Sequence, residues 1–274
     1  MQWPILVTRS VRSIRTDRAC EIGADDQVQE TSSDGMSTRQ TLTLGHERFR
    51  VGPWHADAST AYLALTPDVT RPSVAGLQRC LEQLGRDGYS SIITAALHPD
   101  EARPFLQAGF LEYDRLRVLS HDLSDLDPAR RTPDPLVRLR RARRTDRGAA
   151  LAVDGRAFPP FWRLDSSGLD EAISATPRAR FRVAELDGRI IGYAVTGRAH
   201  TQGFLQRLAT DPQHAGHGVG SALVVDALRW ARRRHVQRVL VNTQDDNERA
   251  LALYRQLGFE MTATDLVVLT RPVP

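Results

Sequence analysis

The chain has 274 residues, of which 41% are hydrophobic, and it carries 37 basic and 33 acidic side chains. That length predicts one large or two modest domains, and the apolar content is sufficient for a buried core, which excludes wholesale disorder. No run approaches the roughly 18 consecutive apolar residues that a membrane-spanning helix needs, so the sequence predicts no membrane association. Two cysteines are too few for a disulfide framework or a zinc site of several thiolates, which favours a reducing cytoplasm.

All 37 basic residues are arginines, because the sequence contains no lysine. This excludes mechanisms that need a Schiff-base lysine or the lysine of a Walker phosphate-binding loop. The arginine bias is compatible with a GC-rich coding sequence or with arginine-mediated contacts to nucleic acid. We favour the first interpretation, and nucleic acid is not an expected partner.

The first half of the chain divides into three segments. Residues 1–35 are polar and lack periodicity, which predicts a disordered extension, and their apolar patch is too short for a signal peptide. Residues 36–123 form a first module, and residues 124–135 contain three prolines among charged residues, which predicts a linker. Within the first module we predict strands and helices that alternate, at Ala61–Leu65, Val74–Leu84, Tyr89–Ala95, Asp100–Ala108 and Arg115–Leu119.

The second module, residues 136–274, opens with a predicted strand over Leu136–Arg141 and a helix capped by Thr145 that runs toward Phe158. Six arginines between positions 138 and 147 either line a solvated strand edge or contact phosphates. Further along, the apolar runs Phe181–Leu186 and Arg189–Thr196 are separated by Asp-Gly, the strongest short signal for a hairpin.

A glycine-rich loop follows the next predicted strand, Gly203–Thr210. Asp211-Pro212 ends that strand, and glycines at positions 216, 218 and 220 lead directly into a helix with one apolar face. Glycines let the backbone approach a ligand closely, and the free N–H groups at a helix start attract anions. The sequence therefore predicts an anion site that is not a Walker loop, because no Gly-Lys-Ser/Thr follows.

A second motif lies beyond another predicted strand, Val236–Val241, in the run Asn247 to Phe259. Asn247 and Tyr254 are seven residues apart, so a helix places them on one face about 10 Å apart along its axis. Both side chains can therefore face one ligand.

These two motifs resemble the signatures of the GNAT N-acetyltransferase superfamily. Its Arg/Gln-x-x-Gly-x-Gly/Ala pattern is matched by Gln213, Gly216 and Gly218, and its Asn-x-x-Ala…Tyr-x-x-x-Gly-Phe pattern by the run that begins at Asn247. The resemblance covers roughly residues 136–270. It implies a mixed α/β fold whose parallel strands splay apart at the cofactor, and transfer of an acetyl group from acetyl-CoA to a primary amine by direct attack.

The resemblance also implies roles for individual residues. Amides from His214 through Ser221 would bind the pyrophosphate of acetyl-CoA, the strand end before them would pair with the pantetheine arm, Asn247 would bond that arm, and Tyr254 would protonate the departing thiolate. A phenol with a pKa near 10 suits that task, although Tyr254 could instead only pack its helix. The complete expected set is Leu208, Ala209, Thr210, Gln213, His214, Ala215, Gly216, His217, Gly218, Val219, Gly220, Ser221, Asn247, Ala250 and Tyr254.

Two parts of the site are not assigned in this way. His214 and His217 are three residues apart, but no cysteine or carboxylate cluster completes a ligand set, so no metal is expected. Related enzymes often place a glutamate as general base where this chain has Asn242, so a water relay to Glu185 or Asp245 takes that place as a hypothesis.

The first module resembles a degenerate copy of the second. A shift of 149 residues aligns Ala108-Gly109-Phe110 with Leu257-Gly258-Phe259 and places Phe105 against Tyr254. The segment that corresponds to the glycine loop, Val69–Val74, has no glycine, and its proline removes one N–H donor. We therefore expect a tandem protein whose first module is structural or shapes the substrate site.

Two other classes of function remain open at this point. A non-catalytic acyl-CoA sensor would need the loop but not the hydroxyl of Tyr254. An arginine-rich nucleic-acid binder would show affinity that falls steeply with salt.

Overall fold

The computed structural model describes residues 39–55, 57–66, 71–124 and 136–273. The predicted extension over residues 1–35 and nearly all of the predicted linker lie outside these residues. Within the described residues, no helix is both long and apolar enough to span a membrane.

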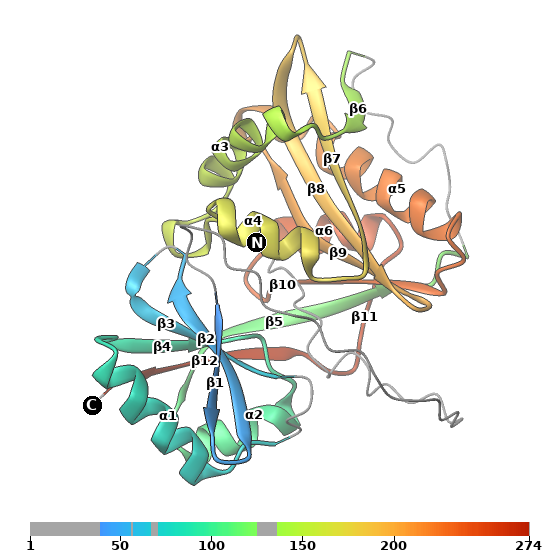
Figure 1. Ribbon diagram of the computed structural model, residues 1–274. Helices are drawn as coiled ribbons and strands as arrows, with labels where there is room; N and C mark the ends of the chain where they lie inside the picture. The colour runs from blue at the N-terminus through green and yellow to red at the C-terminus, as the bar shows by residue number, and fades with distance from the viewer. Residues whose placement is uncertain (1–38, 56, 67–70, 125–135, 274) are drawn as a thin grey trace, which may run out of the picture.

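One mixed sheet runs through the whole molecule, in the order β1-β2-β3-β4-β12-β5-β10-β9-β8-β7-β6, and the short β11 also pairs with β5 (Figure 1). Most neighbours are antiparallel, but β3 with β4 and β9 with β10 are parallel pairs. The strands are β1 Gln40–Leu44, β2 Glu47–Trp54, β3 Asp57–Leu65, β4 Ser91–Thr94, β5 Leu111–His121, β6 Arg138–Arg141, β7 Arg178–Leu186, β8 Arg189–Ala199, β9 Gln202–Thr210, β10 Arg238–Gln244, β11 Glu260–Met261 and β12 Leu266–Pro272.

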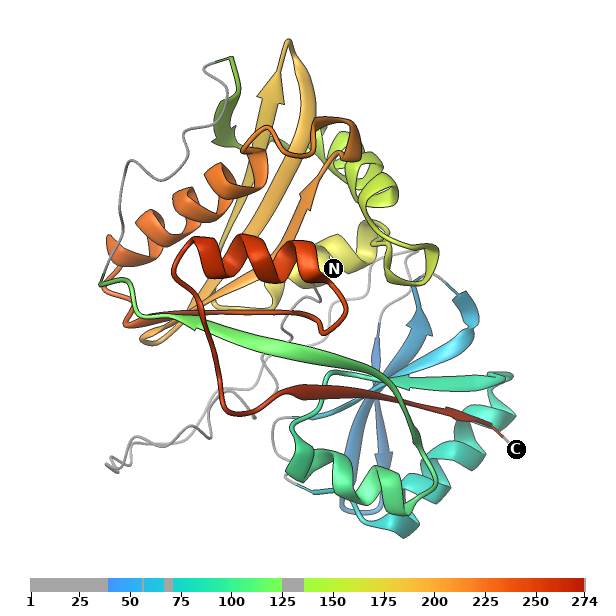
Figure 2. The same cartoon turned by 180° about the vertical axis from the view of Figure 1, so that it is seen from behind.

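Within the described ranges, six α-helices cover this sheet. In the second half α3 and α4 lie on one face and α5 and α6 on the other, while α1 and α2 pack against the strands of the first half (Figures 1 and 2). The cores lie under α5 and α6, under α1 and α2, and between α3, α4 and the strands of both halves. The helices are α1 Val74–Arg86, α2 Pro99–Gln107, α3 Arg147–Ala157, α4 Ser166–Ser174, α5 Val219–Arg232 and α6 Glu248–Gln256.

The two halves share strands. β12, the last strand of the second module, lies between β4 and β5 of the first half, and β5 pairs through Leu116–His121 with β10 of the second half. Figure 2 shows β5 running from the first half of the molecule to the second, with β12 beside the part of β5 that lies in the first half. The boundary predicted between residues 123 and 136 therefore does not separate two independent sheets.

Aromatic contacts also join the halves. The indole N–H of Trp54 donates to the carbonyl oxygen of Phe161 at 3.0 Å, and the two rings stack with centroids 5.4 Å apart. Tyr113 packs edge-on against Trp162. Because these residues come from β2, β5 and the segment between α3 and α4, that segment is fixed by the first half.

Most predicted elements are confirmed within a few residues. In the Asp187-Gly188 turn both residues have positive φ, 49° and 75°, which is the backbone that joins β7 to β8 as a tight hairpin. The cap predicted at Thr145 is wrong. A 3₁₀ turn, Arg144–Asp146, precedes α3, and Asp146 accepts the backbone N–H of Arg143 at 2.6 Å, so the acidic side chain one position later secures the turn.

None of the predicted elements corresponds to β1, β2, α4, β11 or β12. α4 is only nine residues long and is capped by Asp165, whose carboxylate accepts the N–H of Gly168 at 2.7 Å. The predicted arginine-rich strand is present as β6, and it forms the edge of the sheet because it pairs only with β7.

Candidate functional site

The parallel strands β9 and β10 separate in the middle of the sheet. They pair only at Arg238–Gln202, Val239–Gly203 and Leu240–Phe204. Beyond these pairs β9 continues to Thr210 and β10 to Gln244 without pairing to each other. Beyond Leu205, the edge of β9 that faces β10 has no pairing with that strand, which matches the predicted splay.

The glycine loop connects the open end of β9 to α5. Gly216 and Gly218 have φ values of +84° and +76°, a conformation that side chains rarely adopt, and Gly218 is the residue that precedes the first turn of α5. A Cβ atom on Gly216 would meet no atom within 4 Å, so its open side faces free space. The loop ends at the N-terminus of a 14-residue helix, whose first N–H groups have no partner within the helix and carry partial positive charge.

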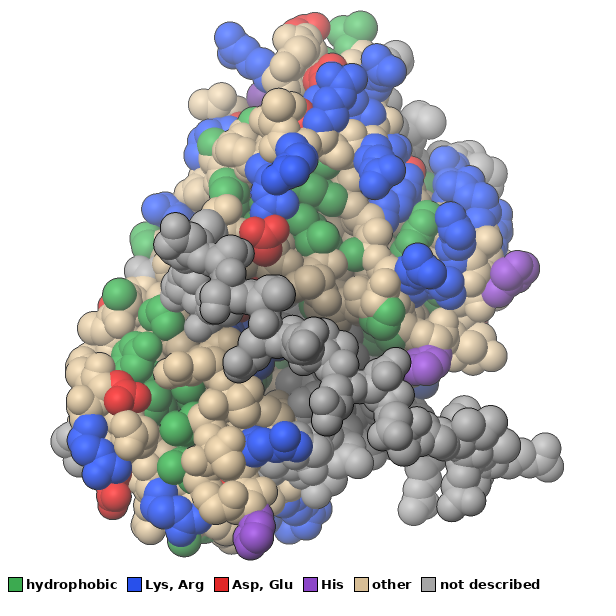
Figure 3. Space-filling view, viewed as in Figure 1, with side chains coloured by type: hydrophobic (Ala, Val, Ile, Leu, Met, Phe, Trp, Pro, Cys, Tyr) green, Lys and Arg blue, Asp and Glu red, His purple; other side chains and the backbone are tan. Residues whose placement is uncertain are grey.

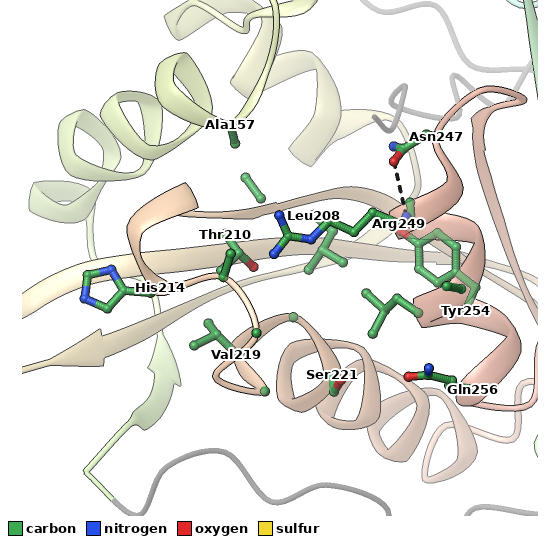
Figure 4. A pocket seen from close by; sticks show the side chains of 18 of the residues that line it. Ala157, Leu208, Thr210, His214, Val219, Ser221, Asn247, Arg249, Tyr254 and Gln256 are labelled. Carbon is green, nitrogen blue, oxygen red and sulfur yellow. Dashed lines mark hydrogen bonds between the residues drawn. The ribbon is translucent and has the colours of Figure 1, made fainter.

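A cavity of about 570 Å³ lies between this loop, β9 and α6 (Figure 4). Its size falls in the range of about 300–1,000 Å³ that is typical of ligand pockets. We call it the loop cavity. It is lined by Ala157, Phe158, Leu208, Ala209, Thr210, His214, Ala215, Gly216, Gly218, Val219, Gly220, Ser221, Gln244, Asp246, Asn247, Arg249, Ala250, Ala252, Leu253, Tyr254 and Gln256.

Nearly all of the expected site residues meet in this cavity. The two exceptions are Gln213, whose backbone N–H donates to Asp211 at 3.1 Å, and His217, which is exposed and whose ring Nδ1 lies 3.1 Å from the carbonyl oxygen of Ala215. His214 does line the cavity, so the two histidines diverge. Among the described residues no group of three or more His, Cys, Asp or Glu side chains could bind a metal ion.

Asn247 has a clear structural task at the start of α6. Its side-chain oxygen accepts the N–H of Ala250 at 3.2 Å, and its side-chain nitrogen donates to the hydroxyl of Thr243 at 3.0 Å. It is thus a helix cap that also ties α6 to β10. A ligand in the cavity would meet the remaining lone pair and hydrogen of this amide.

Tyr254 lies seven residues further along α6 and lines the same cavity. Its side chain is almost fully buried, and its ring lies 5.5 Å from that of Phe259, centroid to centroid. Burial raises the pKa of the Tyr254 phenol well above its usual value of about 10, because the charged form would lose its hydration. The value near 10 assumed from sequence alone is therefore too low, and the phenol keeps its proton throughout the physiological range.

Two parts of the cavity wall carry no motif in the sequence. Arg249 extends from α6 across the cavity toward Leu208, which places a cation beside the free edge of β9 (Figure 4). The sequence signal that could have identified Arg249 was its position between Asn247 and Ala250 of the second motif. Ala157 and Phe158, at the end of α3, form the other unexpected wall.

A buried ion pair fixes the Phe158 wall. Arg207 of β9 is 2% exposed, and its guanidinium makes a two-bond contact with Asp154 of α3, with both distances at 2.8 Å. The same guanidinium donates to the carbonyl oxygen of Trp162 at 2.8 Å and lies 3.5 Å from the centre of the Phe158 ring. Arg207 therefore ties the end of α3 to the strand that borders the cavity.

The general-base hypothesis changes with the structure. Glu185 lies on β7, accepts from Arg140 at 2.6 Å and does not line the cavity, so these contacts give no support to a relay through Glu185. Asp245 is exposed, and its neighbour Asp246 lines the cavity. Close by, Gln244 donates to Asp114 at 2.9 Å, and burial together with the charges of Asp246 and Asp245 raises the pKa of Asp114.

The matching place in the first half is closed. The pairing of β3 with β4 extends to Leu63, two residues before β3 ends, so these strands do not splay as β9 and β10 do. At the start of α1 the carboxylate of Glu47 accepts from the backbone N–H and the hydroxyl of Ser73. An internal anion thus occupies the helix N-terminus where a phosphate would bind.

A model of the acetyltransferase (GNAT) family matches residues 149–259, the segment that builds the loop cavity. The mycothiol acetyltransferase of Geodermatophilus obscurus is 30% identical over 258 residues, which cover 87% of this chain and 80% of that relative. The chain belongs to the GNAT acetyltransferase family.

Other curated relatives of this GNAT protein carry the same name. The mycothiol acetyltransferase of Saccharomonospora viridis is 31% identical over 189 residues, 62% of this chain and 60% of the relative. That of Acidimicrobium ferrooxidans is 34% identical over 139 residues, 46% of this chain and 44% of the relative. In these two alignments the chain therefore spans 60% and 44% of the relative's length.

Solved structures show the same fold. A tandem GNAT protein from the clavulanic acid biosynthesis pathway superposes with a TM-score of 0.62 at 16% identity, covering 83% of this chain and 79% of that one. A GCN5-related N-acetyltransferase from Kribbella flavida gives 0.59 at 18% identity, covering 86% and 90%. The expected tandem GNAT layout is confirmed, with a mixed α/β sheet shared by both halves.

Proposed function

We propose that this protein transfers an acetyl group from acetyl-CoA to a primary amine. The observation that carries the proposal is the loop cavity, in which the free edge of β9, the N–H groups at the start of α5 and the ring of Tyr254 border one space. The first feature fits an amide-containing chain, the second an anion, and the third a leaving group that needs a proton.

The donor would lie along β9 and end at the loop. Backbone groups beyond Leu205 have no partner strand on the β10 side, so the pantetheine amides would pair with them as an added strand does. The pyrophosphate oxygens would accept hydrogen bonds from the N–H groups of the loop and of the first turn of α5. Arg249, which extends across the cavity, would add a charge-assisted hydrogen bond to the pyrophosphate.

The chemistry requires one bond to form and one to break. The lone pair of a neutral amine attacks the thioester carbonyl carbon, the new C–N bond forms, and the C–S bond breaks with its electrons on sulfur. The hydroxyl of Tyr254 would protonate that thiolate, and a carboxylate would take the proton that the amine nitrogen loses. Asp246 in the cavity wall, or Asp114, whose pKa is raised and which accepts from the cavity residue Gln244, would take the second task.

The different N-termini of α1 and α5 support different roles for the two halves. Residues 136–274 would carry catalysis, while the module over residues 36–123 would bind no acetyl-CoA, because Glu47 fills the position of a phosphate. The first module would shape the acceptor side of the site, a role supported by the contacts of Trp54 and Tyr113 with the segment after α3.

A turnover screen tests the proposal. Acetyl-CoA is offered with a panel of polyamines, amino sugars, N-terminal peptides and, because the curated relatives are named mycothiol acetyltransferases, the unacetylated form of mycothiol. We expect release of free CoA to depend on one class of amine, and mass spectrometry to show the acetylated product. Saturable binding of acetyl-CoA without turnover on any amine would instead support the acyl-CoA sensor.

The glycine loop provides a second test. Gly216→Asp places a carboxylate on the open side of the loop, where it would repel the pyrophosphate, so we expect acetyl-CoA to bind at least about tenfold more weakly. Gly188→Asp is the matched control, because Gly188 has a similar φ of +75° and equally open surroundings in the β7–β8 turn. Calorimetry should give one site per chain for the unmodified protein, and equal affinities for the two variants would contradict the loop assignment.

A further inference from the structure

A second cavity, of about 620 Å³, lies at the edge of the sheet and uses none of the residues of the loop cavity. We call it the arginine cavity. It is formed where β6 ends, so that the first residues of β7 face outward, and the start of α3, α4 and the end of α5 close it. Its wall consists of Arg141, Ala142, Arg143, Arg144, Arg147, Ile173, Ala179, Arg180, Phe181, Arg182, Trp230 and Arg234.

Seven of these side chains are arginines, and only part of their charge is balanced. Arg147 pairs with Asp170, and Arg180 and Arg182 share the single carboxylate of Asp226, at 2.8 and 3.0 Å. The remaining four, Arg141, Arg143, Arg144 and Arg234, have no ion pair with any residue that the structure describes.

The pKa of Arg180 agrees with this excess of positive over negative charge in the cavity wall. Burial lowers the pKa of the Arg180 guanidinium, and the positive charges of Arg182 and Arg233 lower it further, against the opposing effect of Asp226. An anion in the cavity would reduce that repulsion. Arginine side chains gather on the half of the surface that carries β6, β7 and α5 (Figure 3).

The cavity is more than a charged surface, because apolar side chains line it between the arginines. Ile173, Phe181 and Trp230 come from α4, β7 and α5, and each is partly buried. A planar guanidinium binds phosphate through two parallel N–H bonds, and an indole ring packs against a flat ring. The combination suits a ligand that carries several phosphates and a ring.

α5 connects this cavity with the loop cavity. Its first residues, Val219 to Ser221, border the loop cavity, and Trp230 in its last turn borders the arginine cavity. At about 1.5 Å per residue the two sites lie roughly 15 Å apart along the helix. The two cavities share no lining residue, so the sites are separate.

We propose that the arginine cavity is a second binding site, for a small molecule with a chain of two or more phosphates attached to a ring. Three features of the cavity support this proposal: its volume, its four arginines that form no ion pair with a described residue, and its apolar wall. It does not depend on the identity of the amine acceptor or on catalysis in the loop cavity.

The probes are inorganic tripolyphosphate and ATP, titrated calorimetrically into the full chain at 150 mM salt with and without saturating acetyl-CoA. We expect both to bind one site per chain, ATP more tightly because its ring contacts Trp230, and neither to be displaced by acetyl-CoA. Displacement by acetyl-CoA would place the probes in the loop cavity and overturn the proposal, as would the absence of saturable binding.

Substitutions distinguish binding in the arginine cavity from attraction to the net positive charge of the protein. Arg143→Gln with Arg144→Gln should weaken both probes on the order of 100-fold, because two charge-assisted contacts are lost. Arg234→Gln should weaken them about tenfold from the opposite wall. The matched control is Arg86→Gln with Arg103→Gln, which makes the same change in net charge on exposed positions of the first half.

The controls also decide between ligand classes. The control pair should leave both affinities unchanged, and equal weakening by both pairs would show that only net charge matters. A single-stranded oligonucleotide that binds more tightly than ATP, with affinity falling steeply as salt rises, would assign the surface to nucleic acid instead and overturn the small-molecule site. Thermal melts of each variant confirm that it is folded.

Discussion

Replacing Tyr254 with phenylalanine should lower turnover by about 10²- to 10⁴-fold while acetyl-CoA affinity changes little. The substitution keeps the ring against Phe259 and removes the hydroxyl whose proton would neutralise the CoA thiolate. Steady-state kinetics with the acceptor found in the screen, together with calorimetry of acetyl-CoA, measure the two effects separately.

A second buried tyrosine supplies the control. Tyr62 of β3 is fully buried, and burial raises its pKa to about 12, but it lies outside both cavities. Tyr62→Phe should therefore keep full turnover. If Tyr254→Phe also retains it, with chemistry shown to limit the rate, Tyr254 is a packing residue and water is the proton donor.

The raised pKa of Tyr254 predicts the alkaline side of the pH profile. A donor must be protonated to act, and a phenol with an elevated pKa stays protonated as pH rises through 10. Loss of the Tyr254 proton should therefore not reduce kcat below about pH 10. An alkaline limb centred below that pH in the unmodified protein, and absent in Tyr254→Phe, would contradict the burial of this hydroxyl.

Asp154→Ala should cost about 3–5 kcal/mol in the free energy of unfolding, because it leaves the guanidinium of Arg207 buried without its carboxylate. The same carboxylate also accepts the hydroxyl of Tyr193 and the N–H of Leu164, so both would lose a partner. Urea unfolding followed by circular dichroism measures the loss. A weaker affinity for acetyl-CoA should accompany it, since Arg207 fixes the Phe158 wall.

Two further variants test the reason for that loss. Glu112→Ala removes an exposed pair with Arg115, in which both side chains are more than 40% accessible, and should cost no more than about 1 kcal/mol. Asp154→Leu combined with Arg207→Met removes both buried charges and should be milder than Asp154→Ala. Equal costs for Asp154→Ala and Glu112→Ala would show that the buried pair does not stabilise the fold.

The parts of the site that could be predicted from the sequence are those written in one continuous stretch. The glycines of the loop and the Asn247–Tyr254 spacing are local, and a helix or a tight turn translates them directly into geometry. Phe158 and Arg207 could not be found in this way, because their roles depend on α3 packing against β9, some 50 residues away. Arg249 sat inside a recognised motif at a position that the motif leaves free.

The same contrast between local and long-range information applies to the fold. Strands beside a clear turn signal, such as β7 and β8, were predicted, whereas α4 has only nine residues, which is too few for a sustained helical period. No local pattern could have revealed that β12 inserts between β4 and β5, because a strand's composition does not name its partners. Strand pairing across the length of the chain is thus the main information that single-sequence reasoning lacks.

The insertion of β12 has a consequence for synthesis and for proteolysis. While the ribosome is still making the second half, β4 and β5 expose the edges that only residues 266–272 later fill, so the first sheet cannot close until nearly the whole described chain has emerged. Such unpaired edges recruit other chains, which makes a chaperone useful during that interval. Conversely, a protease cut between residues 124 and 136 would leave two fragments that stay together, since each supplies a strand to the other's sheet.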